Sequence, residues 1–93
     1  MPEISQILET SEASIFVSLN ELRKYNVMVG VKRTSVTLEP PVWAILIEVA
    51  QEQGCSVHDL CSFINERKSE DSSLSSAIRV FLISYLNIKV KKG

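Results

Sequence analysis

Polar side chains alternate with largely apolar ones along the seven residues Lys32–Leu38. Successive side chains of an extended strand point to opposite faces, so Arg33, Ser35 and Thr37 share one face. A guanidinium can bond the O6 and N7 atoms of guanine in the major groove of DNA, and hydroxyls can bond several base edges. The opposite face, which includes Val36, can enter a core. The alternation therefore predicts a strand with one buried face and one polar face.

A second polar group lies at Ser56, where a helix is predicted to begin. Serine is typical of a helix N-cap, and Asp59 three residues later makes a variant of the capping box. The free N–H groups at a helix start carry partial positive charge and can bind an anion such as a phosphate. The residues alone leave simpler roles open, with Ser56 as only a cap and Arg33 as the partner of a surface acid.

Cys55, His58 and Cys61 have the types and spacing of a small metal-binding cluster. A structural zinc site usually has four protein ligands, and the chain has no second pair of Cys or His. Cys61 also falls on the apolar face of the predicted helix, where a free thiol usually packs. We therefore expect neither a metal nor a cofactor. The chain has no Gly-rich phosphate loop and no nucleophile elbow, so we expect no enzyme activity.

The charge of the chain is distributed unevenly around a net value of −1. Residues 22–37 carry four basic side chains and no acid, whereas residues 1–21 carry four acids and no basic side chain. A basic strand within an acidic protein is compatible with an anionic partner as well as with ordinary surface charge. No apolar run could span a membrane and the acidic start does not resemble a secretion signal, so we expect a cytoplasmic protein.

The predicted strand needs a partner. Asn26–Val31 is rich in β-branched residues and is expected to be extended, with Gly30 as a bulge or a bend. Pro40 cannot donate to a ladder, so the strand ends near Glu39. An isolated strand has unpaired backbone groups on both edges. The simplest partner is the same strand of a second copy, which would form a two-stranded antiparallel ribbon between chains.

The apolar periodicity after the strand predicts three helices. They are expected to begin near Pro41, Ser56 and Ser75. Gly54 suits a left-handed cap after the first helix, and the second helix runs to about Arg67. The third helix is apolar nearly all round because Val80 and Ile83 add to its main apolar face, so it should be buried on several sides.

The residues before the strand read as an N-terminal extension, residues 1–29. Ile15, Leu19 and Leu22 have helical spacing, although Ile15–Val17 can also be read as a short strand. We expect the extension to be partly helical and to pack on the rest, because it has too many apolar residues for a disordered tail. The predicted domain covers residues 30–88, and residues 89–93 form a basic tail.

The order of strand, helix, glycine turn and second helix resembles the ribbon-helix-helix proteins, the class of the Arc and MetJ repressors. The resemblance is carried by Gly54–Val57, which matches a Gly-x-Ser turn of that class. A closer resemblance to a subgroup of short bacterial ribbon-helix-helix proteins is carried by Arg33–Pro40, Trp43 and Leu74–Phe81. Residues 1–29 fall outside the resemblance.

The resemblance implies a mainly α-helical fold with one short strand, in an intertwined homodimer whose ribbon enters the major groove of duplex DNA. It implies base contacts by Arg33, Ser35 and Thr37 and phosphate contacts by Lys32, Ser56, Val57 and His58. The dimer core is then expected to contain Val36, Leu38, Trp43, Leu46, Leu60, Ile64 and Phe81. The resemblance is also compatible with higher-order assembly on DNA and with a partner protein that residues 1–29 bind.

Two functions follow from this reading of the sequence. The first is a sequence-specific DNA-binding transcriptional regulator, a repressor that acts as a homodimer. The alternative is a protein-interaction module, an antitoxin-like or adaptor dimer that has the same fold and does not bind DNA. The acidic composition favours the alternative, whereas the basic strand beside a helix start favours DNA binding.

Overall fold

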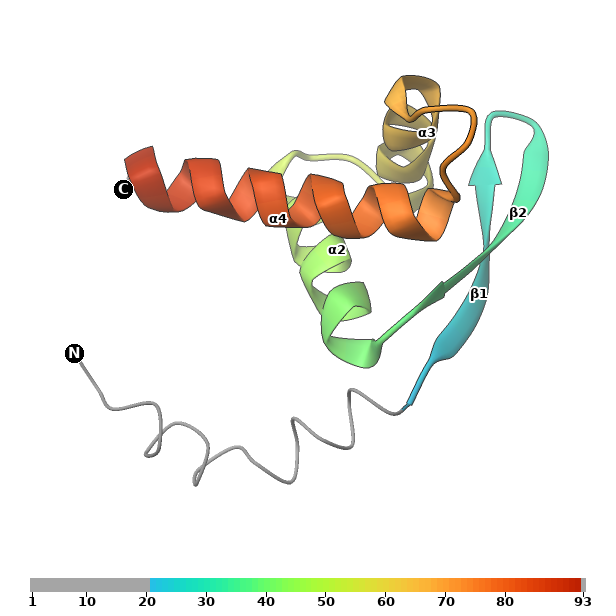
Figure 1. Ribbon diagram of the computed structural model, residues 1–93, viewed down its shortest axis with the longest axis horizontal. Coiled ribbons are helices and arrows are strands. Elements are labelled where there is room, and N and C mark those ends of the chain that lie inside the picture. The colour runs from blue at the N-terminus through green and yellow to red at the C-terminus, as the bar shows by residue number, and fades with distance from the viewer. Residues whose placement is uncertain (1–20, 93) are drawn as a thin grey trace.

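The computed structural model describes residues 21–92. A β-hairpin lies at one side, and three helices pack against one of its faces (Figure 1). The elements are β1 (Arg23–Val29), β2 (Lys32–Leu38), α2 (Pro40–Glu52), α3 (Val57–Arg67) and α4 (Leu74–Lys92). Helix α4 begins beside the hairpin and runs away from it toward the opposite side of the molecule. Among these residues, no helix is long and apolar enough to cross a membrane.

The hairpin pairs β2 with a second strand of the same chain. The strands are antiparallel, with Asn26 opposite Ser35 and Val29 opposite Lys32. Gly30, the first residue of the two-residue connection, has a φ of 63°, which suits the first position of a type II′ turn. The bounds predicted for β2 are confirmed. The prediction of one strand is wrong. Of the two expectations for Gly30, a bulge or a bend, the bulge is wrong, because Gly30 turns the chain back on itself.

Part of the predicted N-terminal extension is therefore a strand of the domain. The strand β1 occupies residues 23–29, and Leu22 before it is not helical. The helical segments predicted within residues 1–20 lie outside the described residues.

The core lies between the inner face of the hairpin and the three helices. It contains Val27, Val36, Leu38, Trp43, Leu46, Val49, Ala50, Leu60, Cys61, Ile64, Leu74, Ile78 and Leu82. The hairpin contributes alternate residues of each strand, as a half-buried sheet requires. The helices contribute residues three and four apart. No side chain in the core is polar or charged within the described part of the chain.

The helix ends largely follow their predicted signals. After α2, Gly54 has a φ of 68° and so adopts the left-handed conformation expected of it. Ser56 caps α3, since its hydroxyl accepts a hydrogen bond from the Asp59 amide at 3.0 Å. The predicted cap of α4 is wrong. The Ser73 hydroxyl accepts from the Ser76 amide at 3.1 Å, whereas Ser75 bonds to the hairpin instead.

Helix α4 is less buried within this chain than its composition predicts. Only Leu74, Ile78 and Leu82 are buried, whereas the side chains of Val80 and Ile83 are 62% and 69% exposed. The helix also continues through Lys92, across most of the residues that were assigned to a basic tail. Burial on several sides is therefore not found within the single chain, and burial of Val80 and Ile83 by a second copy stays a prediction.

Candidate nucleic-acid interface

One face of the hairpin points away from the helices. We call it the outward face, and it consists of Lys24, Asn26 and Met28 on β1 and Arg33, Ser35 and Thr37 on β2. All of these except Thr37 are exposed, and Thr37 is half-buried. The three residues predicted to contact bases thus lie together on one face. They share it with three residues of β1 that the sequence reading did not single out.

Opposite residues of the outward face lie close together. The backbone N–H groups of Met28 and Thr37 donate to helix side chains, so these groups point away from the partner strand. The direction of the backbone N–H group repeats every two residues along a strand, so Asn26 and Ser35 also form a non-hydrogen-bonded pair. The Cα atoms of such a pair are about 4.5 Å apart. In agreement, the Ser35 hydroxyl donates to Oδ1 of Asn26 at 3.0 Å.

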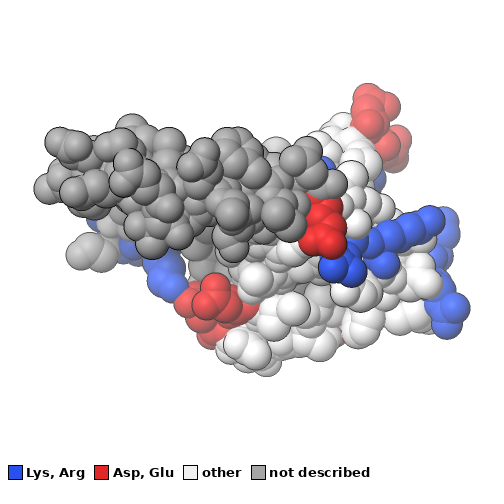
Figure 2. All heavy atoms as spheres, turned by 90° about the horizontal axis from the view of Figure 1, so that it is seen from below, with Lys and Arg blue, Asp and Glu red and all other residues white. Residues whose placement is uncertain are grey.

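The hairpin is a basic region of the chain. It carries Arg23, Lys24, Lys32 and Arg33 and no acid between residues 22 and 38. Arg23 pairs with Glu21 at 3.0 Å, but none of the ion pairs within residues 21–92 involves Lys24, Lys32 or Arg33. Lys and Arg side chains gather at the end of the molecule where the hairpin lies (Figure 2). This end of the described chain therefore presents positive charge.

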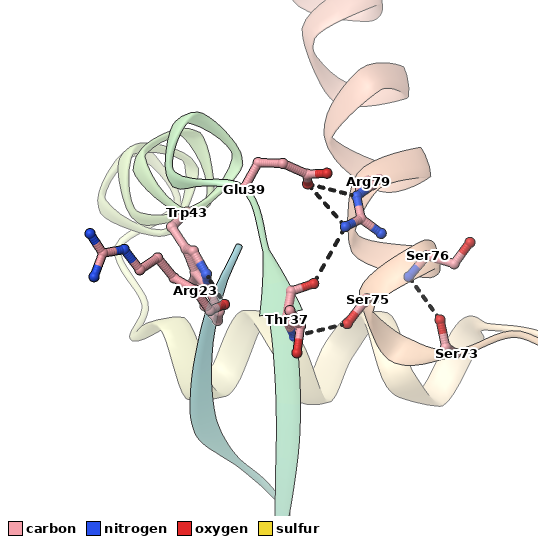
Figure 3. Close-up of polar contacts among 8 residues, drawn as sticks. All are labelled: Arg23, Thr37, Glu39, Trp43, Ser73, Ser75, Ser76 and Arg79. Carbon is pink, nitrogen blue, oxygen red and sulfur yellow. Dashed lines mark hydrogen bonds and ion pairs between the residues drawn. The ribbon is translucent and has the colours of Figure 1, made fainter. Parts of the chain in front are cut away.

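Helix α4 holds the C-terminal end of β2. The Thr37 amide donates to the Ser75 hydroxyl at 3.1 Å, and the Arg79 guanidinium donates to the Thr37 carbonyl at 3.4 Å (Figure 3). Arg79 also bonds one carboxylate oxygen of Glu39 through two nitrogens, at 2.9 and 3.0 Å. The backbone amide of Glu39 and the Arg79 guanidinium hold the pKa of the Glu39 carboxyl below its usual value. These contacts hold the end of β2 against α4, directly before α2 begins.

Strand β1 is held by α2 at one end and by α3 at the other. The indole Nε1 of Trp43 donates to the Arg23 carbonyl at 2.9 Å, and the Trp43 ring meets Tyr25 edge to face at 5.0 Å. Near the turn, the Met28 amide donates to Nδ1 of His58 at 2.9 Å, and the Gly30 amide donates to the Ser62 hydroxyl at 3.2 Å. Helix side chains therefore bond some of the backbone groups along both outer edges of the hairpin. In an isolated ribbon these groups would be unpaired.

The predicted phosphate contacts fall at two places. Lys32 is exposed at the start of β2. Ser56, Val57 and His58 lie at the start of α3, beside β1, where Ser56 acts as the cap and His58 holds the Met28 amide. The Asp59 carboxylate accepts from the Ser56 amide at 3.5 Å, which adds a negative charge to this helix start. The helix start is thus less favourable to an anion than its sequence suggests.

The residues predicted to form a dimer core lie in the core of the single chain. Six of the seven are buried there, and only Phe81 is half-buried. Phe81 contacts Phe63 and Tyr85, with ring centroids 6.4 and 6.0 Å away. The contact of any of these residues with a second copy stays a prediction.

The two cysteines lie in the helical part of the molecule. Cys61 lies on the buried face of α3. Burial raises the pKa of its thiol to about 11, so the thiol is protonated at neutral pH. Cys55 is half-buried. Within the described residues, no three side chains among His, Cys, Asp and Glu are grouped so that they could hold a metal ion.

The β1 half of the outward face is what the sequence reading missed. A signal for it was present, because Gly30-Val31 separates two runs rich in β-branched residues by two positions. A Gly-x connection of that length predicts a hairpin with a type II′ turn. That assignment places Lys24 and Asn26 opposite Thr37 and Ser35 on the outward face.

Comparison with known proteins agrees with this architecture. A solved structure, that of an uncharacterized protein from Bordetella pertussis Tohama I, resembles the chain with a TM-score of 0.65 and 20% sequence identity. The similarity covers 88% of this chain and 72% of that protein's chain, and it supports the fold alone. A search of the curated proteins finds no match. The sequence pattern of the family described as "Ribbon-helix-helix domain" matches residues 22–86, so the chain belongs to this family, whose domains are typically non-enzymatic DNA-binding regulators.

Proposed function

We propose that the protein is a sequence-specific DNA-binding transcriptional regulator that places the outward face of its hairpin in the major groove. The observation that carries this proposal is the exposed Arg33 on a basic two-stranded ribbon with no acid between residues 22 and 38. The major groove of B-DNA is about 12 Å wide and admits a two-stranded ribbon. Membership in the ribbon-helix-helix family supports the same function.

The residues of the interface have different roles in this proposal. Arg33 reads guanine because its guanidinium can donate to O6 and N7 together. Ser35 and Thr37 are more permissive, since a hydroxyl can donate to or accept from several base edges. Lys32 and the start of α3, with Ser56, Val57 and His58, contact phosphates and set the position of the protein on the duplex. We expect Lys32 to contribute most among these, because Asp59 opposes an anion at the helix start.

We infer that the functional unit is a homodimer, which acts as a repressor in the bacterial cytoplasm. The exposed apolar side chains of α4 support dimerisation, since a second copy could cover them. The intertwined arrangement with a ribbon formed between chains stays a prediction. Pairing two β2 strands along the edge that faces away from β1 would require the Thr37 amide to leave Ser75, and pairing them along the other edge would require β1 to leave its ladder with β2. A dimer that is joined through α4 avoids both losses.

A protein-interaction module is the second candidate, and one observation favours it. The same apolar face of α4 could hold a different protein instead of a second copy. In that case the hairpin would be a structural element whose positive charge has no anionic partner. The two candidates differ in their response to salt, because binding through phosphates releases counterions.

Selection from a random duplex library tests the proposal directly. The protein should enrich a defined sequence, and its affinity should fall with salt by about 0.9 log units per log unit of salt for each phosphate contact. Single-stranded DNA of the enriched sequence is the control, because it lacks the major groove that the ribbon enters. Retention without either enrichment or salt dependence would exclude the DNA-binding regulator and leave the interaction module.

A further inference from the structure

A pocket of about 300 Å³ lies between the end of α3 and the start of α4. Small-molecule sites in proteins usually have volumes of about 300–1,000 Å³, so this pocket is large enough for a single compact ligand. Its walls are of two kinds. Phe63, Val80 and Phe81 make one side apolar, whereas Arg67, Ser72 and Ser76 are among the polar residues of the other.

The guanidinium of Arg67 is held in place at this pocket. Its central carbon is 3.6 Å from the centroid of the Phe63 ring, and one of its nitrogens donates to the Phe63 carbonyl at 3.1 Å. The Glu66 carboxylate is 3.6 Å from the same nitrogen, but both side chains are more than half exposed, so this ion pair is weak. A guanidinium has five N–H donors. Arg67 therefore keeps donors for a second anion.

Ser72 and Ser76 bring hydroxyl groups to the same pocket. Their backbone amides are bonded within the loop and at the start of α4, but neither hydroxyl takes part in a hydrogen bond within residues 21–92. Lys68, which also lines the pocket, donates to the Ser69 carbonyl at 3.3 Å and belongs to none of the ion pairs in the described part of the chain. The polar side thus offers two positive charges and two hydroxyls.

We propose that this pocket is a binding site for a small aromatic carboxylate. The aromatic ring of the ligand would pack against Phe63 and Phe81, and its carboxylate would accept hydrogen bonds from Arg67 and from the hydroxyls. A carboxylate suits a guanidinium because the two groups can form parallel charge-assisted hydrogen bonds. A cation would be repelled by Arg67 and Lys68. A purely apolar occupant would bury the guanidinium without a partner, which is costly.

Helix α4 connects the pocket to the hairpin. Ser76 lines the pocket, and its neighbour Ser75 accepts from the Thr37 amide. Arg79, one residue before the pocket residue Val80, donates to the Thr37 carbonyl. A ligand that binds one arrangement of α4 stabilises that arrangement. Bound ligand should therefore slow hydrogen exchange at the Thr37 amide.

Titration of the full chain with 2-naphthoate, followed by NMR, tests the site. The backbone amide signals of Arg67, Ser72 and Ser76 should shift and saturate, with a Kd of about a millimolar or lower for a ligand of this size. The neutral isostere 2-naphthamide is the matched ligand control. It has the same ring system without the charge, so it should bind at least about 5-fold more weakly.

Three variants separate charge recognition from packing. Arg67→Gln should weaken 2-naphthoate by about 5-fold or more and leave 2-naphthamide unchanged, because only the charged ligand uses the guanidinium. Glu66→Gln should instead strengthen 2-naphthoate, since it removes a carboxylate that repels the ligand. Lys91→Gln removes an equal charge near the end of α4 and should change neither affinity. Melting temperatures show whether any loss of binding is a loss of folded protein.

Several results would overturn the proposal. They are shifts that do not saturate or that lie outside the pocket, equal affinities for the two ligands, and an Arg67→Gln variant that weakens both ligands alike. Val80 is also expected at the contact between two copies, so the titration is repeated at several protein concentrations. Binding that disappears as the chain associates would assign the pocket to that contact instead. Unchanged exchange at Thr37 in the saturated chain would exclude the connection to the hairpin.

Discussion

Two exposed surfaces of this molecule differ in nearly every physical property. The outward face of the hairpin is polar and basic, and its side chains keep their hydration without a partner. The exposed side of α4 is rich in apolar residues, with Val80, Ile83, Ile88 and Val90 all more than half exposed beside polar ones such as Ser84 and Asn87. Contiguous apolar surface is typical of protein contacts, whereas a basic polar ribbon suits a charged polymer. We therefore propose DNA as the partner of the first surface and protein as the partner of the second.

The two surfaces also differ in how they are supported. Both ends of the hairpin are held by side chains of the helices, through Trp43, His58, Ser75 and Arg79. Helix α4 is bonded to α2 through Tyr85 and Lys89, which both contact Glu52, and its exposed apolar residues border a groove of about 170 Å³ that Val42, Ile45 and Ile83 help to line. We therefore expect the hairpin to act as a rigid ligand surface and the exposed apolar residues of α4 to become buried against a partner.

The largest effect should come from placing a charge on the apolar surface. Ile83→Asp should dissociate the dimer, weakening it by at least about 100-fold, because burying an unpaired carboxylate costs several kcal/mol. Sedimentation equilibrium at several protein concentrations measures this. Gln51→Glu, which adds the same charge at an exposed residue of α2, is the matched control. A wild-type chain that stays monomeric at all concentrations would contradict the assignment of this surface to a second copy.

A smaller effect is expected where α4 holds the hairpin. Arg79→Ala removes the partner of Glu39 and of the Thr37 carbonyl, and it should lower the free energy of unfolding by about 1 kcal/mol. Lys91→Ala, an equal loss of charge near the end of the helix, should cost much less. Urea unfolding of both variants at neutral pH measures the difference.

The same contact predicts a dependence on pH. The pKa of Glu39 is below its usual value of 4.5 in the folded chain, so its contribution to stability is fully present above pH 4.5. It is lost as the pH falls through the lowered pKa. Arg79→Ala should therefore lose less stability than the wild type on acidification from pH 6 to pH 3, roughly the range in which carboxyl groups titrate. Equal losses in the two proteins would show that the ion pair does not stabilise the fold.

The most local effect should be at the hairpin turn. His58→Ala leaves the Met28 amide without its partner, which should cost about 0.5–1.5 kcal/mol. Hydrogen exchange should become faster at the amides of Met28 and Gly30 and stay unchanged at Val27, whose strand pairing is intact. Unchanged exchange at Met28 would mean that His58 does not hold the turn in solution.

The sequence predicted the local elements well because their signals are local. Alternation placed β2 at residues 32–38, Gly54 marked the end of α2, and Ser56 with Asp59 marked the start of α3. The pairing of β2 with β1 was missed, because it depends on a two-residue turn at Gly30, which was interpreted as a bulge or a bend. The cap of α4 was misplaced by two residues, since Ser73 and Ser75 are chemically equivalent until the hairpin is in place.

The candidate site was predicted in part for the same reason. The common face of Arg33, Ser35 and Thr37 follows from strand periodicity alone and agrees with the structure. The contribution of β1 and the bond between Asn26 and Ser35 depend on the pairing register, which composition does not specify. The dual use of His58, at the start of α3 and as the acceptor of a strand amide, depends on how α3 packs against β1. The sequence alone does not contain that packing.

The assignment of DNA to the outward face is tested most directly by comparing Arg33→Ala with Lys91→Ala on the selected duplex and on a scrambled one, each at two salt concentrations. Both variants remove one positive charge, but only Arg33 lies on the outward face. We predict that Arg33→Ala weakens binding to the selected duplex by about 1–3 kcal/mol for each lost bidentate contact and reduces the preference over the scrambled duplex. Lys91→Ala should leave that preference intact. Equal behaviour of the two variants, or a wild type with neither sequence preference nor salt dependence, would contradict it.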